Sequence, residues 1–371
     1  MNPLHDLTLE KRSHSQRPQG AAKVAFGSVF ADHMFTLDYS DGRWHSPRIR
    51  PYGPIALDPA CATLHYGQTV FEGLKAFAGV DGRVRLFRPD ANAKRLADSC
   101  RRMCIPPVDP ELFVAAVRAL VGVDRAWVPH EPGHSLYIRP VLFATESHLE
   151  VRPSQTFQLV VFTAPVGAYL DVSAVALKVQ TEFCRAAPGG VGAAKTAGNY
   201  AASLLPTAVS QAEGYHQTLW LDGASRRYVE EAGYMNVFFL IDDTVITPPL
   251  GGTILPGVTR DCALTLLRQR GQQVEERPIT IDEVFAASET GRLREVFGTG
   301  TAAVVSAVGK IAWEGRELVV NHGQPGPLTT ALGEEITAIQ RGRLADAWGW
   351  TVVVDDTALP AASDPAVPVA P

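Results

Sequence analysis

The sequence predicts an α+β fold with two domains and a cleft between them. Its 371 residues are enough for two cores of ordinary size. Strand-like and helix-like segments occur in both halves, and a stretch at 166–178 interrupts the strand-like pattern. The predicted divisions are a flexible extension at 1–23, a small domain at 24–168, an interdomain loop at 169–178, a large domain at 179–356 and a disordered Ala/Pro-rich tail at 357–371.

The first half is predicted to be mainly strand, with two helices. Residues 24–88 alternate apolar and polar positions around the turn sequences SDG (40–42) and VDG (80–82), as hairpins require. One helix runs from about Asp90 to Met103, and another begins at Asp109 with Pro110 in its first turn. Further strands are expected at 135–145, 157–165, 216–222 and 235–248, the last as a hairpin.

The second half adds a Gly/Ala-rich segment at 189–203 and two helices. The segment 254–271 predicts a helix that is entered through Pro256-Gly257 and ends at Gly271. TIDE at 280–283 is a capping-box pattern that opens the other helix.

The composition excludes several classes of protein. A net charge of −5 gives no overall attraction to nucleic acid or acidic membranes. No run approaches the roughly 18 apolar residues of a membrane span, and residues 1–20 lack the apolar core of a secretory signal. The five cysteines are dispersed without a C-x-x-C pair, so neither a disulfide framework nor a metal site is expected. A reduced cytoplasmic protein is predicted.

The segment GGVGAAKT at 189–196 differs at one position from the phosphate-loop pattern G-x-x-x-x-G-K-[ST]. A phosphate loop follows directly on a buried strand and needs glycine before the lysine. Here Ala194 stands at that position, and FCRAAPGG precedes the lysine. A phosphate-loop nucleotide-binding protein is therefore the weakest alternative.

Lys195 is a candidate nucleophile because small apolar residues surround it. No other charged residue occurs from Pro188 to Gln211. Partial desolvation lowers the pKa of a lysine and favours the neutral amine, which can form an imine with an aldehyde cofactor. A solvated surface charge is the ordinary alternative, and these residues alone leave both interpretations open.

Six ordered motifs carry a resemblance to a known family: FEGLKAF (71–77), SLYIRP (135–140), GGVGAAKTAGNYAAS (189–203), VEEAGYMNVFF (229–239), ILPGVTR (254–260) and FGTGTA (297–302). Together they closely resemble the branched-chain aminotransferases, which are pyridoxal-phosphate enzymes of the D-amino-acid-aminotransferase-like fold. The resemblance runs from about Phe26 to about Val354. It implies a smaller open α/β domain, a larger domain with a barrel-like β core, and an active site between them.

The resemblance assigns roles toward pyridoxal 5′-phosphate. Lys195 matches the Schiff-base lysine, and Tyr200 matches the phenol that hydrogen-bonds the cofactor's ring hydroxyl. Glu231, rather than Glu230, matches the carboxylate that pairs with the pyridine nitrogen. An arginine and the amides that open a helix suit the phosphate. The remaining cofactor-binding positions implied are Arg95, Leu255, Val258, Thr259 and Thr301.

The resemblance also assigns substrate contacts. Arg139 would meet the side-chain carboxylate of glutamate at the edge of an apolar pocket, since an unpaired carboxylate is costly to bury. The other substrate-binding positions implied are Phe26, Tyr66, Phe71, Tyr137, Tyr169, Tyr234 and Ala302. Leu149 and Val151 match a loop that reaches the second subunit of a homodimer. Tyr234 departs from relatives, which often carry a small residue or threonine there, and this leaves the exact substrate preference open.

The function implied is reversible ping-pong transfer of the amino group from L-leucine, L-isoleucine or L-valine to 2-oxoglutarate. The expected partners are these amino acids, glutamate and the corresponding 2-oxo acids. Two activities of the same fold are alternatives, D-amino-acid aminotransferase and aminodeoxychorismate lyase; Arg139 and the longer N-terminal region argue against both. An inactive cofactor-binding protein is a further alternative.

Overall fold

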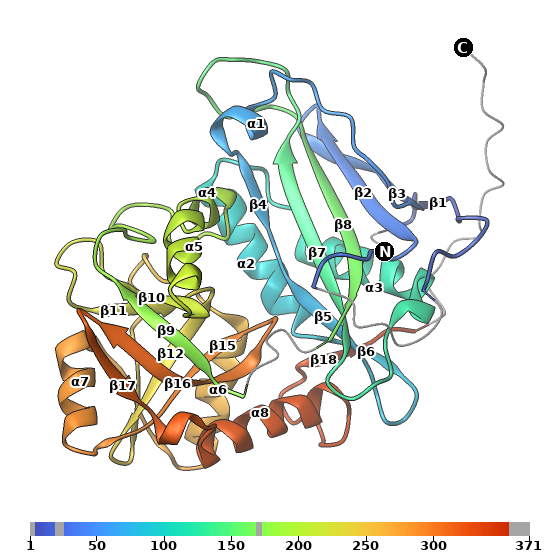
Figure 1. Cartoon of the computed structure of the whole chain (residues 1–371). Helices are drawn as coiled ribbons and strands as arrows, with labels where there is room; N and C mark the ends of the chain where they lie inside the picture. Colours follow the sequence, from blue (N-terminus) through green and yellow to red (C-terminus); the bar gives the residue numbers. More distant parts are fainter. Residues whose placement is uncertain (1–3, 19–25, 168–172, 356–371) are drawn as a thin grey trace. The chain divides into compact units, whose positions relative to one another are not determined.

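The computed structural model describes residues 4–18, 26–167 and 173–355 (Figure 1). The chain divides into two compact units, Met1–Tyr169 with Ile339–Pro371, and Leu170–Ala338. Tyr169 and the predicted tail at 357–371 lie outside the described residues.

An open sheet forms the first unit. Within the described residues its strands follow the order β1-β3-β2-β8-β7-β5-β6-β18, and β4 pairs with β7 beside this path. The pairs are antiparallel except β1 with β3, and the predicted hairpins β2–β3 and β5–β6 are confirmed. The strands are β1 (Thr8–Leu9), β2 (His33–Ser40), β3 (Arg43–Pro51), β4 (Thr69–Phe71), β5 (Leu74–Ala78), β6 (Val84–Phe87), β7 (Ser135–Ala144), β8 (Phe157–Val166) and β18 (Thr351–Val353).

Helices α2 and α3 lie side by side and pack against this sheet (Figure 1). The start of α3 is the predicted one, because the Asp109 carboxylate accepts hydrogen bonds from the N–H groups of Glu111 at 2.9 Å and Leu112 at 3.1 Å. Such a cap stabilises a helix by about 1 kcal/mol. The helices of this unit's N-terminal part are α1 (Ala62–Tyr66), α2 (Pro89–Arg102), α3 (Pro110–Val123) and the 3-10 turn η1 (Arg125–Trp127).

Both ends of the chain differ from the predicted divisions. Residues 4–18 were expected to be flexible, but β1 pairs with β3, and Leu4, Leu7 and Leu9 are buried in the core of the first unit. Residues 339–355 were assigned to the second domain, but β18 pairs with β6. The first unit therefore holds the longer share of the chain, whereas the larger domain was expected on the C-terminal side. Both differences arise because these segments pair with strands that are far away in the sequence.

A closed barrel forms the second unit, as the resemblance implied. Six of the described strands follow one another as β11-β10-β9-β16-β15-β12, and β12 pairs with β11 to close the ring. β13 and β14 extend the sheet beyond β12, and β17 pairs with β16. These strands are β9 (Val175–Gln180), β10 (Gln217–Leu221), β11 (Val229–Ala232), β12 (Met235–Ile241), β13 (Thr244–Thr247), β14 (Gln273–Glu276), β15 (Leu293–Gly300), β16 (Val304–Trp313) and β17 (Arg316–Val319).

The helices of the second unit follow the predicted start signals. Gly257 precedes α6, and the Thr280 hydroxyl accepts a 3.1 Å hydrogen bond from the Glu283 N–H at the start of α7. None of the described helices is long and apolar enough to cross a membrane. The helices are α4 (Ala197–Ala201), α5 (Leu204–Ala212), α6 (Val258–Gln269), α7 (Ile281–Glu289), η2 (Asn321–Gly323) and α8 (Pro327–Gln340), whose last two residues belong to the first unit.

Candidate active site

Lys195 lies at the end of the Gly/Ala-rich loop, two residues before α4 begins, and its side chain is half-buried. Its Nζ donates a 2.7 Å hydrogen bond to the hydroxyl of Tyr200. The same nitrogen lies 5.1 Å from the centroid of the Tyr200 ring. The loop and the short helix thus place a primary amine against a phenol.

The loop before Lys195 is held by side-chain and backbone contacts. The Asn199 Nδ2 donates to the carbonyl oxygens of Val191 and Ala194, both at 2.8 Å. Gly192 allows a close approach on the other side, because a Cβ there would lie only 2.4 Å from the carbonyl oxygen of Thr253. The small residues that look like a phosphate loop in sequence therefore serve to pack this loop against neighbouring backbone.

Glu231 is a buried carboxylate near Lys195, with only 4% of its surface exposed. Its Oε1 accepts a 2.6 Å hydrogen bond from the Leu255 N–H and lies 3.3 Å from Nη2 of Arg185. Burial raises the pKa of Glu231, although the positive charges of Arg185 and Lys195 and the Leu255 amide favour the ionised form. Arg185 was not predicted as a site residue, since nothing local in the sequence links it to Glu231.

Helix α6 opens with Val258 and Thr259, and its N-cap residue is Gly257, which has no side chain to cap the helix. Asn236 on β12 donates from Nδ2 to the Leu255 carbonyl oxygen at 2.9 Å. A Cβ on Gly257 would lie 2.0 Å from Asn236 Oδ1, so glycine is required for this contact. The barrel thereby fixes a helix N-terminus, whose free amides and dipole favour an anion. Asn236 was also missed, although it pairs with Glu231 across the β11–β12 hairpin.

The other predicted residues of the second unit lie on turns of the barrel. Tyr234 occupies the turn between β11 and β12, and its ring stacks on that of Tyr200 with centroids 5.4 Å apart. Thr301 and Ala302 are half-buried in the turn between β15 and β16. β15 packs against α6 and pairs with β12.

In the first unit, four predicted substrate-binding residues come together, and Arg139 is one of them. The Arg139 guanidinium lies 5.0 Å from the ring centroid of Phe71 and 5.3 Å from that of Tyr137. Its Nη2 donates to the Tyr137 hydroxyl at 3.1 Å, and its buried Nε has no hydrogen-bond partner among the described residues. The ring of Phe26 meets that of Tyr137 edge-on at 5.0 Å. The described contacts of this cation are with neutral groups.

Arg95 is buried on α2 and pairs with Glu72. Its Nε and Nη2 donate to the two carboxylate oxygens at 2.7 and 2.9 Å, which fixes the plane of the guanidinium. Lys75 on β5 is a second buried cation of this unit. It lies in the FEGLKAF motif, but its burial was not predicted. Burial lowers the pKa of Lys75 to about 8, and its strand partner is Tyr137.

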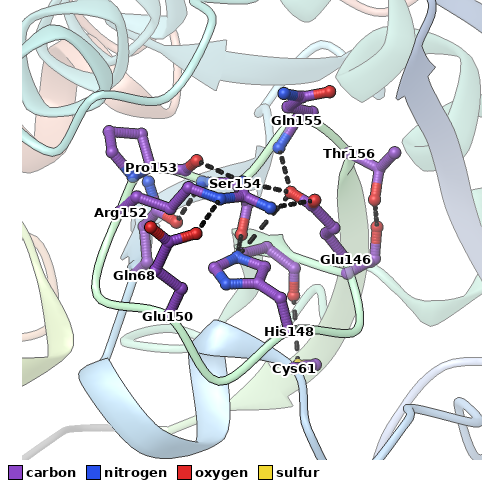
Figure 2. Close-up of polar contacts among 12 residues, drawn as sticks. Cys61, Gln68, Glu146, His148, Glu150, Arg152, Pro153, Ser154, Gln155 and Thr156 are labelled. Carbon is purple, nitrogen blue, oxygen red and sulfur yellow. Dashed lines mark hydrogen bonds and ion pairs between the residues drawn. The ribbon is translucent and has the colours of Figure 1, made fainter.

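The loop that carries Leu149 and Val151 is ordered by its own polar side chains (Figure 2). The Glu146 carboxylate accepts hydrogen bonds from the Arg152 guanidinium at 2.7 and 3.1 Å, and this contact lowers the pKa of Glu146 to about 2. Leu149 and Val151 are 66% and 81% exposed. The Tyr66 hydroxyl donates to the Leu149 carbonyl oxygen at 2.5 Å. This hydrogen bond holds the Tyr66 side chain against the loop.

The donor set of the second unit fits pyridoxal phosphate. An amine with an adjacent phenol, a buried carboxylate and an uncapped helix N-terminus match an aldehyde with a ring hydroxyl, a ring nitrogen and a phosphate. Within the described residues no group of three or more His, Cys, Asp or Glu side chains is placed to hold a metal ion.

Comparison with known proteins shows the family of this chain. The family Amino-transferase class IV matches residues 69–311. The chain is 48% identical to "Branched-chain-amino-acid aminotransferase 2" of Bacillus subtilis over 335 residues, which cover 90% of this chain and 92% of the relative.

Solved structures show the same fold. The branched-chain amino acid aminotransferase of Escherichia coli superposes with a TM-score of 0.73 at 27% identity, covering 87% of this chain and 99% of the other. The branched-chain aminotransferase of Thermoproteus uzoniensis, solved with norvaline, gives a TM-score of 0.73 at 26% identity and covers 87% and 100%. The chain therefore belongs to the class IV aminotransferases and, among these, to the branched-chain-amino-acid aminotransferase family.

Proposed function

We propose that this protein uses pyridoxal phosphate to transfer the amino group of L-leucine, L-isoleucine or L-valine to 2-oxoglutarate. The observation that carries the proposal is the hydrogen bond from Lys195 Nζ to the Tyr200 hydroxyl, formed in the same unit as buried Glu231. The names of its relatives supply the substrate class.

The residues of the site would act as follows. Bound pyridoxal phosphate supplies an electron-accepting ring that stabilises negative charge at the substrate Cα. The amine of Lys195 would hold the cofactor and would act as the general base that moves the proton at the substrate Cα. Tyr200 orients the Lys195 amine, and Glu231 holds a proton at the pyridine nitrogen. The N-terminus of α6, together with Arg95, Thr301 and Leu255, is assigned to cofactor binding as the resemblance implies.

We further propose that the protein is a cytoplasmic homodimer, with Leu149 and Val151 facing the second copy. Both apolar side chains are strongly exposed. They lie on a loop that polar contacts hold in place (Figure 2), which supports a contact of this kind. The roles of Tyr66, Tyr169 and Ala302 in substrate binding stay predictions.

An absorption titration tests the proposed function. The purified protein, loaded with pyridoxal phosphate, should show a visible band that L-isoleucine removes and 2-oxoglutarate restores. Each step reports one half-reaction, because the amino group must leave the first substrate before the second arrives. D-Isoleucine serves as the stereochemical control and should leave the band unchanged. A band that responds only to D-amino acids would instead favour the D-amino-acid aminotransferase alternative.

Arg139→Met should selectively impair the dicarboxylate substrates. Charged hydrogen bonds contribute about 1.5–3 kcal/mol, so we expect the KM for 2-oxoglutarate to rise about ten- to hundredfold. The KM for 4-methyl-2-oxopentanoate should change little, because this acid has no second carboxylate. Steady-state kinetics with the two 2-oxo acids measures the difference.

The matched control is Arg118→Met, which removes an arginine of the same unit that pairs with Asp355 at 3.3 Å. It should leave both KM values unchanged. Equal losses for the two 2-oxo acids in Arg139→Met would contradict the assigned role of Arg139.

A further inference from the structure

Tyr234 stands at a rigid position of the barrel. Gly233 and Tyr234 form the two-residue turn between β11 and β12, since Ala232 pairs with Met235. The Gly233 N–H donates to the Thr218 carbonyl oxygen at 2.6 Å. Gly233 has a φ of +60°, and a Cβ there would lie 2.3 Å from the side chain of Gln217. The turn therefore requires glycine, and its position beside β10 sets the direction of the next side chain.

The side chain of Tyr234 contacts Tyr200 on α4 and Ser203, which lies two residues beyond the end of that helix. Its ring stacks on the Tyr200 ring at 5.4 Å between centroids, with only 17° between the planes. Its hydroxyl lies 3.4 Å from the Ser203 hydroxyl, which in turn donates to the Tyr200 carbonyl oxygen at 2.7 Å. Tyr234 itself is 41% exposed, so it is not simply a core residue.

Helix α4 needs such a contact to hold its phenol. It has only five residues, Ala197–Ala201, and so short a helix is marginal by itself. The plane of the Tyr200 ring determines where its hydroxyl meets Lys195 Nζ. One face of that ring is covered by an aromatic ring carried on the barrel, on the same hairpin as Glu231.

We propose that Tyr234 is a positioning residue that holds the Tyr200 phenol against the Lys195 amine by stacking on its ring. The inference rests on the proposed function and deepens it, because it changes the role of Tyr234 from a substrate contact to a support for Tyr200. The Tyr234 ring acts through Tyr200, and its hydroxyl is dispensable.

The test follows the bound cofactor by its absorption as the pH is varied. Tyr200→Phe shifts the midpoint of this titration, and Tyr234→Thr shifts it in the same direction by a smaller amount, about 0.4 to 1 pH unit. This range corresponds to the loss of one aromatic stack. We expect kcat of Tyr234→Thr to fall about two- to tenfold. Tyr234→Phe keeps the ring and should behave as the wild type.

A double-mutant cycle separates positioning from a direct effect. If Tyr234 acts through Tyr200, the variant Tyr200→Phe/Tyr234→Thr has the same midpoint as Tyr200→Phe alone. Tyr228→Thr is the matched control, since this tyrosine precedes β11 and is similarly exposed at 43%. It should change neither the midpoint nor kcat. Tyr234→Leu replaces Tyr234→Thr if the latter does not fold.

Three results would overturn the inference. The midpoint of Tyr234→Thr could equal that of the wild type, the shifts could add in the double variant, or Tyr234→Phe could behave like Tyr234→Thr. A wild-type protein without a visible band would instead contradict the proposed function, so the two failures are distinguishable.

Discussion

Lys195→Ala should be almost inactive in transamination. The variant loses the amine that, under the proposed function, attaches the cofactor and moves the proton at the substrate Cα. General acid–base catalysis alone contributes roughly 10²–10⁴-fold, and losing the covalent attachment adds to this deficit. Turnover of L-isoleucine with 2-oxoglutarate measures the loss. Wild-type turnover would refute the assignment of Lys195.

Lys310→Ala is the matched control for Lys195→Ala. Lys310 belongs to the same unit, and its amine donates a 3.1 Å hydrogen bond to Glu317 on neighbouring β17. Removing this surface amine should leave turnover and the visible absorption band unchanged. The comparison separates loss of the site amine from loss of a positive charge on the barrel.

Glu231→Gln should lower kcat about 10²- to 10³-fold, as the loss of one preorganised electrostatic contact does in other enzymes. The amide can still accept the hydrogen bond of the Leu255 N–H, but it cannot hold a proton at the pyridine nitrogen. Steady-state kinetics with L-isoleucine gives the measurement, and the cofactor band should remain visible.

Glu230→Gln provides a neighbouring control. Glu230 is also buried, and burial raises its pKa too, but its Oε1 accepts a hydrogen bond from the Thr253 hydroxyl at 2.5 Å. This variant should retain kcat within a few-fold of the wild type. If Glu230→Gln and Glu231→Gln lowered kcat equally, the specific role assigned to Glu231 would be contradicted.

The stability of the Glu231→Gln apoprotein has an expected sign. Because burial raises the pKa of Glu231 above its ordinary 4.5, ionising it costs the folded state free energy. This cost is complete above the folded pKa and disappears as the pH falls below 4.5. At pH 7 the variant should therefore have a Tm equal to or above that of the wild type, and the difference should shrink toward pH 4.5.

Local signals predicted several secondary-structure elements. Pro110 after Asp109 marked the start of α3, and turn residues marked the β2–β3 hairpin, because caps and turns depend on neighbours in sequence. The pairing of β1 with β3 and of β18 with β6 could not be predicted in this way. Partners far apart in sequence leave no local pattern.

The residues of the candidate site also include some that the sequence predicted and some that it did not. The motif around Lys195 and the resemblance it carries identified the amine, the phenol of Tyr200 and the carboxylate of Glu231. Arg185 and Asn236 were not identified, since their contacts with Glu231 and Leu255 arise only when the loop, the barrel and the turn before α6 pack together.

The sequence by itself determined the family and the reaction class, because ordered motifs retain chemistry-bearing side chains at recognisable positions. Only the tertiary structure decided where the Tyr234 ring lies. In the sequence it appeared as a bulky residue where relatives often have a small one. In the structure its ring covers Tyr200, since the β11–β12 turn and α4 meet only after the barrel has closed.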